Sequence, residues 1–316
     1  MKKFTFVITS RNNEKTLKEC IDSCVCANSD ILIADFSSSD DSLKIAENSG
    51  FKTLKMAFYN DYSKLKNELI LECDTEWMFF INANEIFIKN TNTILDFVEK
   101  NHCAKINLMQ EKIVTKPIRI INKQCKFTNP VYEYVINDAK QSEIYLKSHT
   151  IQRFDENLNI IKKWMKEKPF SAQTHYYLSC LYLSNNKFQD FIRTSKYYLF
   201  LEKNKNTSYY MTKYYLAMTY AYVEKNYQEA SKILFEIILE KPLMAEFWCL
   251  LGDIYYSLDK YEKSYHFYEN AMILGSRRLK EDDLPFHIEK YKKHPQDMMF
   301  NCKKIIESSK IYIPNK

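Results

Sequence analysis

An uninterrupted apolar run, WMFFI at Trp77–Ile81, constrains the fold of this chain more than any other feature. An apolar run of this length between polar residues predicts a strand that is buried on both faces of a sheet. Asn82, Asn84 and Glu85 follow the run directly. Ligands of open α/β sheets bind at the carboxyl ends of central strands, so these three polar residues mark a candidate site.

The chain before this run alternates between strand and helix patterns. Three runs rich in β-branched and aromatic residues predict strands at Phe4–Thr9, Ile31–Ala34 and Lys52–Lys55. Helical periodicity or capping residues predict a helix after each strand, at Glu14–Cys26, from Ser37 to Asn48, and at Asp61–Cys73. Such alternation is typical of βαβ units around a parallel sheet. Later strands are predicted at Lys105–Met109 and, as an edge strand, at Ile144–Lys147.

Composition excludes several classes of protein. The 316 residues include only 3 glycines, and the sequence contains neither a G-x-G-x-x-G nor a Walker motif. The net charge of +6 arises after residue 150, and a surplus this small predicts a solvated surface and no nucleic-acid partner. We expect no transmembrane segment or signal peptide. The 9 irregularly spaced cysteines favour reduced thiols in a cytoplasmic protein over a zinc site at Cys20, Cys24 and Cys26.

Polar residues at the ends of the predicted strands form the candidate site. Arg11 follows the first strand, and its guanidinium can bind a phosphate or a base carbonyl. Asp35 ends the second strand, where a carboxylate can accept hydrogen bonds from a ribose or a base. Asp35 and Asp40 can also be capping residues of the next helix, and the residues alone leave both alternatives open.

Four segments carry a family resemblance in the same order: Thr9–Glu14, Ala34–Asp40, Asn60–Asn67 and Asp74–Glu85. They resemble the motifs of family 2 glycosyltransferases of the GT-A fold, an α/β Rossmann-like nucleotide-diphospho-sugar transferase fold. In particular, they are similar to a bacterial subgroup in which tetratricopeptide repeats follow the catalytic domain. The family's D-x-D motif corresponds to Asn82-Ala83-Asn84 in this sequence.

The resemblance implies roles for individual residues. In the family, D-x-D holds Mn²⁺ or Mg²⁺ on the sugar-nucleotide diphosphate. The resemblance implies metal ligands at Asn84, Glu85 and His149. It also implies weaker metal binding than in the family, because asparagine lacks the charge of aspartate. Glu133 corresponds to the glutamate of a G-x-V-H-E segment in which Tyr132 replaces the histidine, and is the candidate catalytic base. The residues implied to bind the nucleotide-sugar are Thr9, Arg11, Asp35, Asp40, Lys66 and Asn82.

The second half of the chain is predicted to be helical repeats. Tyr227, Ala230 and Leu234 recur 34 residues later as Tyr261, Ser264 and Tyr268, a spacing typical of tetratricopeptide repeats. We therefore expect a GT-A-like domain at residues 1–150 and a repeat domain at residues 151–316. Most tyrosines fall at core positions of the repeats. A peptide-binding groove and a homodimer interface are both compatible with stacked repeats.

Two functions are compatible with these features. The first is metal-assisted, inverting transfer of a sugar from a nucleotide-sugar, with UDP-sugars favoured, to a protein or peptide acceptor held by the repeats. A protein or peptide is favoured over a lipid or polysaccharide because repeats commonly hold peptides, and related repeat-bearing enzymes modify bacteriocin peptides, which makes that substrate class worth testing. The second is a catalytically impaired scaffold that recruits a partner, which the loss of both aspartates and of the family histidine favours.

Overall fold

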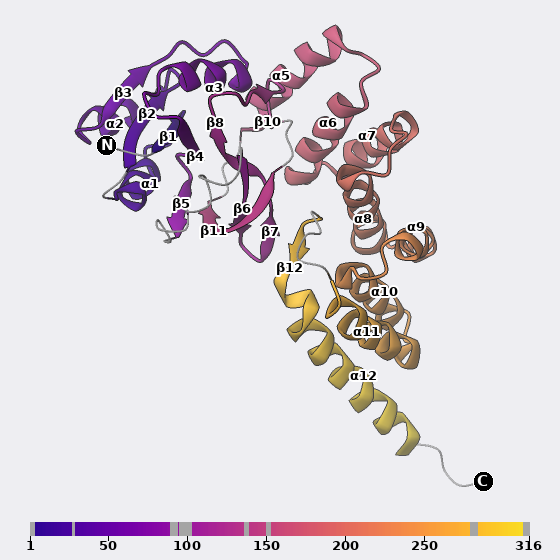
Figure 1. Ribbon diagram of the computed structural model, residues 1–316. Helices are drawn as coiled ribbons and strands as arrows, with labels where there is room; N and C mark the ends of the chain where they lie inside the picture. Colours follow the sequence, from indigo (N-terminus) through magenta and orange to yellow (C-terminus); the bar gives the residue numbers. More distant parts are fainter. Residues whose placement is uncertain are drawn as a thin grey trace. The chain divides into compact units, whose positions relative to one another are not determined.

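The computed structural model describes residues 4–26, 29–88, 94, 103–135, 139–149, 153–278 and 284–311 (Figure 1). The chain divides into two compact units, Met1–Glu167 and Lys168–Lys316. The first unit therefore continues for 17 residues beyond the predicted boundary at residue 150. Helix α5 (Phe154–Glu167), which the sequence pattern placed with the repeats, belongs to the first unit.

The first unit begins with a parallel sheet. Its strands are β1 (Phe4–Ser10), β2 (Ser29–Asp35), β3 (Lys52–Lys55) and β4 (Trp77–Asn82). Strand β1 lies between β2 and β4 and is parallel to both, and β3 is parallel to β2. The connecting helices are α1 (Leu17–Cys24), α2 (Ser42–Glu47) and α3 (Tyr62–Leu71). The predicted βαβ alternation and the central position of Trp77–Ile81 are confirmed.

Beyond β4 the sheet becomes mixed. The later strands are β5 (Glu85–Ile88), β6 (Cys103–Gln110), β7 (Ile113–Thr115), β8 (Ile118–Asn122) and β11 (Lys140–Ser148), and β9 (Phe127–Thr128) pairs with β10 (Tyr134–Val135) in a separate ribbon. Strand β8 is antiparallel to β4, so the parallel arrangement that the βαβ units predict ends at β4. Strand β11 pairs with both β5 and β6, so it is not the predicted edge strand.

Aromatic packing under the sheet fixes the position of β4. The rings of Phe6, Phe79 and Phe87 pack with centroid separations of 5.4–5.7 Å. Helix α1 covers this core with Leu17, Cys20, Ile21 and Cys24, the apolar face that the sequence predicted. Because Cys20 and Cys24 are buried in this face, they act as small apolar side chains.

The second unit is built from antiparallel helix pairs (Figure 1). The three pairs are α6 (Ala172–Ser184) with α7 (Phe188–Leu201), α8 (Thr207–Tyr222) with α9 (Tyr227–Glu240), and α10 (Ala245–Ser257) with α11 (Tyr261–Gly275). Helices α9 and α11 begin 34 residues apart, as the repeat predicted, and Ala230 and Ser264 are buried at equivalent positions. The chain continues through β12 (Phe286–His287), a 3₁₀ turn at Ile288–Tyr291 and α12 (Lys293–Ile311).

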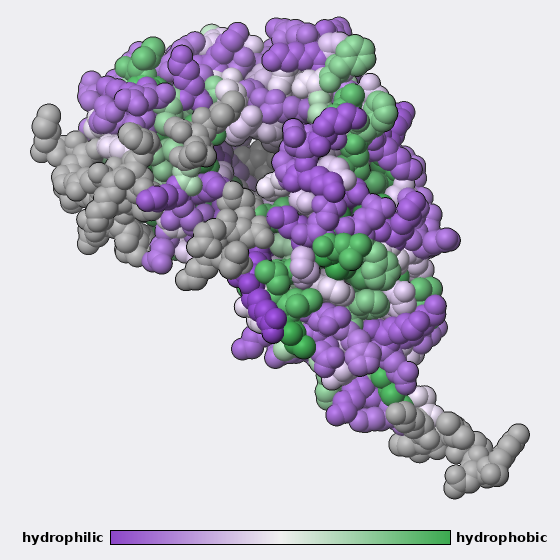
Figure 2. Space-filling model, turned by 45° about the vertical axis from the view of Figure 1, so that its right-hand side comes forward, coloured by the Kyte–Doolittle hydropathy of each residue, from purple (hydrophilic) through white to green (hydrophobic). Residues whose placement is uncertain are grey.

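On the face that Figure 2 shows, the surface of this unit carries both hydrophobic and hydrophilic residues. Figure 2 shows separate hydrophobic patches among predominantly hydrophilic residues. The most exposed large apolar side chains of the helices include Phe200 and Leu239, and the large tyrosines Tyr198 and Tyr268 are buried in the core, as expected. Among the described helices, none combines the length and the apolar character needed to cross a membrane.

Gly252 in α10 makes room for a buried tyrosine of α11. A Cβ atom at this position would lie 2.6–2.8 Å from three ring atoms of Tyr268, which is fully buried. We therefore expect Gly252→Ala to lower the free energy of unfolding by about 1–3 kcal/mol, the usual range for overpacking. Urea denaturation of the full chain measures the change. The exposed Glu262→Ala substitution in α11 is the control, and an equal midpoint for both variants would contradict the prediction.

Candidate functional site

The carboxyl ends of β1, β2 and β4 meet at one edge of the sheet, as predicted. Pairing places Ser10 opposite Asp35 and Thr9 opposite Asn82. A cavity of about 270 Å³ opens at this edge, near the lower limit for small-molecule sites. Its lining includes Thr9, Arg11, Lys66, Asn82, Asn84 and Glu133 from the predicted site. Among the described residues, the cavity lining does not include the other four residues of the predicted site, which are Asp35, Asp40, Glu85 and His149.

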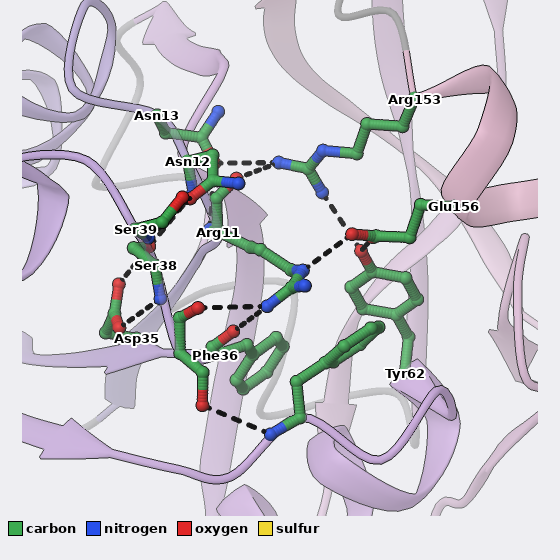
Figure 3. A network of polar contacts seen from close by, with 12 residues as sticks. Arg11, Asn12, Asn13, Asp35, Phe36, Ser38, Ser39, Tyr62, Arg153 and Glu156 are labelled. Carbon is green, nitrogen blue, oxygen red and sulfur yellow. Dashed lines mark hydrogen bonds and ion pairs between the residues drawn. The ribbon is translucent and has the colours of Figure 1, made fainter.

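Arg11 lies in the cavity wall within a polar network (Figure 3). Its Nε donates to Glu156 Oε2 at 2.8 Å, and its Nη1 donates to the backbone oxygens of Phe36 at 2.5 Å and Ser37 at 3.1 Å. The guanidinium also lies over the ring of Phe58, 4.0 Å from its centroid. These contacts fix the orientation of Arg11.

Arg153, the residue before α5, contacts the loop that follows β1 at residues 11–13 (Figure 3). It donates to the backbone oxygen of Arg11, to Asn13 Oδ1 at 3.1 Å and to the hydroxyl of Tyr62 at 3.1 Å. Burial raises the pKa of Tyr62 well above its usual value, and Glu156 raises it further. The phenol therefore stays protonated and donates to Glu156 Oε1 at 2.5 Å. The sequence pattern missed Arg153 and Glu156 because both follow the predicted domain boundary.

The two aspartates after β2 have structural contacts. Asp35 is fully buried and accepts hydrogen bonds from both the backbone N–H and the hydroxyl of Ser38. Asp40 accepts from the backbone N–H of Ser42 at 3.0 Å and of Glu14 at 3.1 Å. Partial burial alone would raise the pKa of Asp40, but these hydrogen bonds lower it below the usual value. Asp40 thus bonds the N–H of Ser42, the first residue of α2, whereas Asp35 bonds Ser38 inside the loop before that helix, whose N-cap position is Asp41.

Lys66 links the end of β4 to the candidate base. Its side chain is almost completely buried, and its Nζ donates to Asn82 Oδ1 at 3.3 Å and forms an ion pair with Glu133. Thr9 Oγ1 donates to the same Asn82 oxygen at 3.1 Å. Burial lowers the pKa of Lys66. Burial alone would raise the pKa of Glu133, but the adjacent ammonium group of Lys66 holds it below its usual value.

The predicted metal ligands do not form a metal site. Buried Glu85 accepts from the backbone N–H of Asn82 at 2.8 Å and from Arg119 at 2.9 Å. The Asn84 amide donates to the backbone oxygen of His149 at 2.6 Å, and the His149 ring lies 3.9 Å from Glu19. Within the described residues, no group of three His, Cys, Asp or Glu side chains is placed to hold a metal. Mg²⁺ in such sites is usually held by one or two carboxylates together with substrate phosphates, and both oxygens of Glu85 already accept hydrogen bonds, so this donor set does not fit the ion.

Three residues that line the cavity each carry a buried polar atom without a hydrogen-bond partner among the described residues. Ser10 Oγ, Asn13 Nδ2 and Arg119 Nε are buried without a partner in the part of the chain that the structure describes. Buried polar groups are almost always satisfied, so such atoms together indicate a missing polar ligand. Two of the three are N–H donors, which favours a ligand with acceptor oxygens.

Comparison with known families identifies the first unit. Residues 5–152 match the family described as Glycosyl transferase family 2. This segment is a family 2 glycosyl transferase domain. The match begins within β1 and spans the sheet and the cavity residues from Thr9 to Glu133, so all four segments that carry the sequence resemblance fall inside it. No curated protein matches the chain.

Several solved structures are partly similar to the chain. MamA residues 41–end from Desulfovibrio magneticus RS-1 shares 18% identity over 49% of this chain and 86% of its own length, with a TM-score of 0.36. The tetratricopeptide-repeat domain of Sgt2 from Aspergillus fumigatus shares 12% over 46% and 86%, with a TM-score of 0.35. Glucosyl-3-phosphoglycerate synthase from Mycobacterium tuberculosis, solved with Mn²⁺, UDP and phosphoglyceric acid, shares 14% over 35% and 44%, with a TM-score of 0.28. Similarities this low support no functional conclusion.

In the family 2 domain, the phenol of Tyr62 is expected to stabilise the cavity wall. Tyr62→Phe removes a hydrogen-bond partner from both Glu156 and Arg153. We expect the free energy of unfolding to fall by about 1–2 kcal/mol, because charged groups lose partners in a partly buried network. The matched control is Tyr59→Phe, which removes the phenol that binds exposed Glu68. Equal urea midpoints for the two variants would contradict this role.

Proposed function

We propose that the protein transfers a sugar from a nucleotide-sugar, with UDP-sugars favoured, to an acceptor. The observation that carries the proposal is the cavity at the carboxyl ends of β1, β2 and β4 in a family 2 glycosyl transferase domain. Its lining contains Arg11, Lys66, Arg119 and Arg153, against one carboxylate, Glu133, among the described lining residues. This charge balance favours an anionic ligand such as a nucleotide diphosphate.

Separate residues of the chain bind the nucleotide-sugar, hold the neighbouring loop and accept the proton. Arg11, Thr9 and Lys66 bind the nucleotide-sugar, Asn82 positions Lys66, and Asp35 and Asp40 hold the loop after β2 in place. The acceptor's heteroatom forms a bond with the anomeric carbon as the bond to the diphosphate breaks, which inverts the configuration. Glu133 removes the acceptor's proton. Since the pKa of Glu133 is below its usual value, its carboxylate is ionised at neutral pH, as a general base requires.

The helical unit is the proposed binding region for the acceptor. Stacked helix pairs of the tetratricopeptide type commonly bind extended peptides. We therefore propose a protein or peptide acceptor. A homodimer formed through these helices remains a separate proposal, which size-exclusion chromatography with light scattering tests.

A catalytically impaired scaffold is the second candidate function. Two observations favour it: Asn82 and Asn84 lack the family's carboxylates, and the ion pair with Lys66 lowers the basicity of Glu133. In this alternative, the first unit binds a nucleotide-sugar weakly or not at all, and the helices recruit a partner.

Product release separates the two functions. The full chain is incubated with a panel of nucleotide-sugars and a peptide library, and the free nucleoside diphosphate and the peptide masses are measured. The enzyme proposal predicts release of one nucleoside diphosphate together with a peptide mass increase of one sugar. Absence of both diphosphate release and peptide modification over the whole panel would support the scaffold and overturn the enzyme proposal.

A further inference from the structure

The amide oxygen of Asn82 occupies the position where the family's first metal-motif aspartate would lie. A carbonyl oxygen has two lone pairs. Both have donors here, because Thr9 Oγ1 lies 3.1 Å and Lys66 Nζ lies 3.3 Å from Asn82 Oδ1. A divalent cation at this oxygen would displace a hydroxyl donor and lie directly beside a buried ammonium group, which repels it.

Glu85 is the nearest remaining carboxylate, and its oxygens also have donors. Oε2 accepts from the Asn82 backbone N–H, and Oε1 accepts from Asn82 Nδ2 at 3.1 Å and from Arg119 at 2.9 Å. The Glu85 side chain is 2% exposed, so these bonds form in a low-dielectric environment where they are strong. Glu85 thus orients Arg119 at the cavity wall.

The positive charge at the end of β4 therefore comes from the protein's own side chains and not from a bound metal ion. Lys66 and Arg119 both line the cavity, and Arg119 Nε is buried without a partner among the described residues. Asn13 and Ser10 also line the cavity, and their buried Nδ2 and Oγ atoms likewise have no partner in the described chain. Ammonium and guanidinium groups can neutralise the charge of a diphosphate and donate hydrogen bonds to its oxygens.

We propose that this cavity binds a nucleotide diphosphate without a divalent metal, with Lys66 and Arg119 supplying the charge that a cation supplies elsewhere in the family. The proposal rests on the proposed function and specifies how the same site recognises its ligand. The unpartnered N–H donors of Arg119 and Asn13 provide binding partners for the diphosphate oxygens. Asn82 acts as a positioning residue, because its oxygen holds the Lys66 ammonium group at the cavity.

Metal dependence of UDP binding tests the proposal directly. The full chain is titrated calorimetrically with UDP in EDTA and, separately, with excess Mn²⁺. We expect dissociation constants that agree within about twofold, whereas a metal bridge would tighten binding by at least about tenfold. UDP binding that requires Mn²⁺ would overturn this inference and leave the proposed function standing. Absence of binding for UDP and all UDP-sugars under both conditions would overturn both.

A matched pair of lysine variants tests whether the ammonium group of Lys66 binds the diphosphate. Lys66→Gln removes the buried ammonium group, and Lys64→Gln removes an exposed one from the same helix. In EDTA, we expect Lys66→Gln to weaken UDP binding by at least about tenfold, the effect of losing charge-assisted bonds. Binding of uridine, which has no diphosphate, is expected to change much less, whereas a purely structural defect would weaken both ligands equally.

Arg119→Gln is measured in parallel because Lys66→Gln leaves Glu133 without its ionic partner and can impair folding. Circular dichroism of each variant checks folding before titration. For Arg119→Gln, we expect the same selective loss of UDP affinity over uridine affinity. Wild-type UDP affinity in the folded forms of both variants would overturn the proposal.

Discussion

Glu133→Gln is expected to lower kcat for sugar transfer by about 10²–10⁴-fold, the usual contribution of a general base. The amide can still accept a hydrogen bond from Lys66, but it cannot take a proton from the acceptor. The KM for the nucleotide-sugar should change little, because the substitution removes a proton acceptor and leaves the cationic side chains in place. Initial rates over a range of both substrates measure the two constants.

The control for this variant is Glu143→Gln on β11, an exposed glutamate of the same unit. It should retain wild-type kinetics. A Glu133→Gln enzyme with kcat within about twofold of wild type would show that another group, or water, accepts the proton.

The pH profile gives an independent test of Glu133. A general base acts in its deprotonated form, so activity falls as the pH falls through its pKa. The pKa of Glu133 is held below the usual 4.5 by Lys66, despite the opposing effect of burial. We therefore expect the acidic limb of kcat/KM to lie below pH 4.5, measured where circular dichroism shows the chain to be folded. An acidic limb near neutral pH would assign the base to a different residue.

Asp253→Asn is expected to lower the free energy of unfolding of the helical unit by about 3 kcal/mol, in the range for breaking a buried ion pair. Asp253 accepts from the hydroxyls of Tyr222 at 2.5 Å and Tyr268 at 2.6 Å. His294 Nε2 lies 3.1 Å and Lys290 Nζ lies 3.3 Å from its oxygens. The substitution leaves Lys290 without its charged partner. Urea denaturation of the full chain, followed by tyrosine fluorescence, measures the loss.

The stabilising effect of Asp253 should depend on pH in a defined direction. Burial alone would raise its pKa, but the bonds from His294, Lys290, Tyr222 and Tyr268 hold it well below 3.8. The contribution is therefore complete above pH 3.8 and is lost as the pH falls further towards the folded-state pKa. The exposed Asp259→Asn, which binds only Tyr261 among the described residues, is the control. Equal stability of both variants at pH 7 would contradict the role of Asp253.

Local patterns in the sequence predicted the strands well because burial is encoded in each segment. Trp77–Ile81 is apolar throughout, and β4 has sheet neighbours on both sides. Pairing partners were harder to predict. In β11, Ser142, Ile144 and Leu146 are buried and alternate with more exposed residues. This alternation predicts a strand with one buried face, but it does not reveal that β5 and β6 lie on its two sides.

Part of the candidate site can also be predicted from the sequence. Thr9, Arg11 and Asn82 follow from strand ends, because parallel strands bring their carboxyl ends together. Asp35 also lies at a strand end, but its short side chain bonds to Ser38 in the next turn, a local competition that strand ends do not reveal. Arg153 and Glu156 contact Arg11 from 142 and 145 residues away in the sequence, so only the folded structure brings them together.

A crystal structure of the full chain grown with UDP in EDTA shows whether the cavity binds a diphosphate without metal. We expect electron density for the nucleotide in the cavity at the ends of β1, β2 and β4, with diphosphate oxygens within hydrogen-bond distance of Lys66 Nζ and Arg119. UDP bound at a different place, or an empty cavity at UDP concentrations that saturate binding in solution, would contradict it.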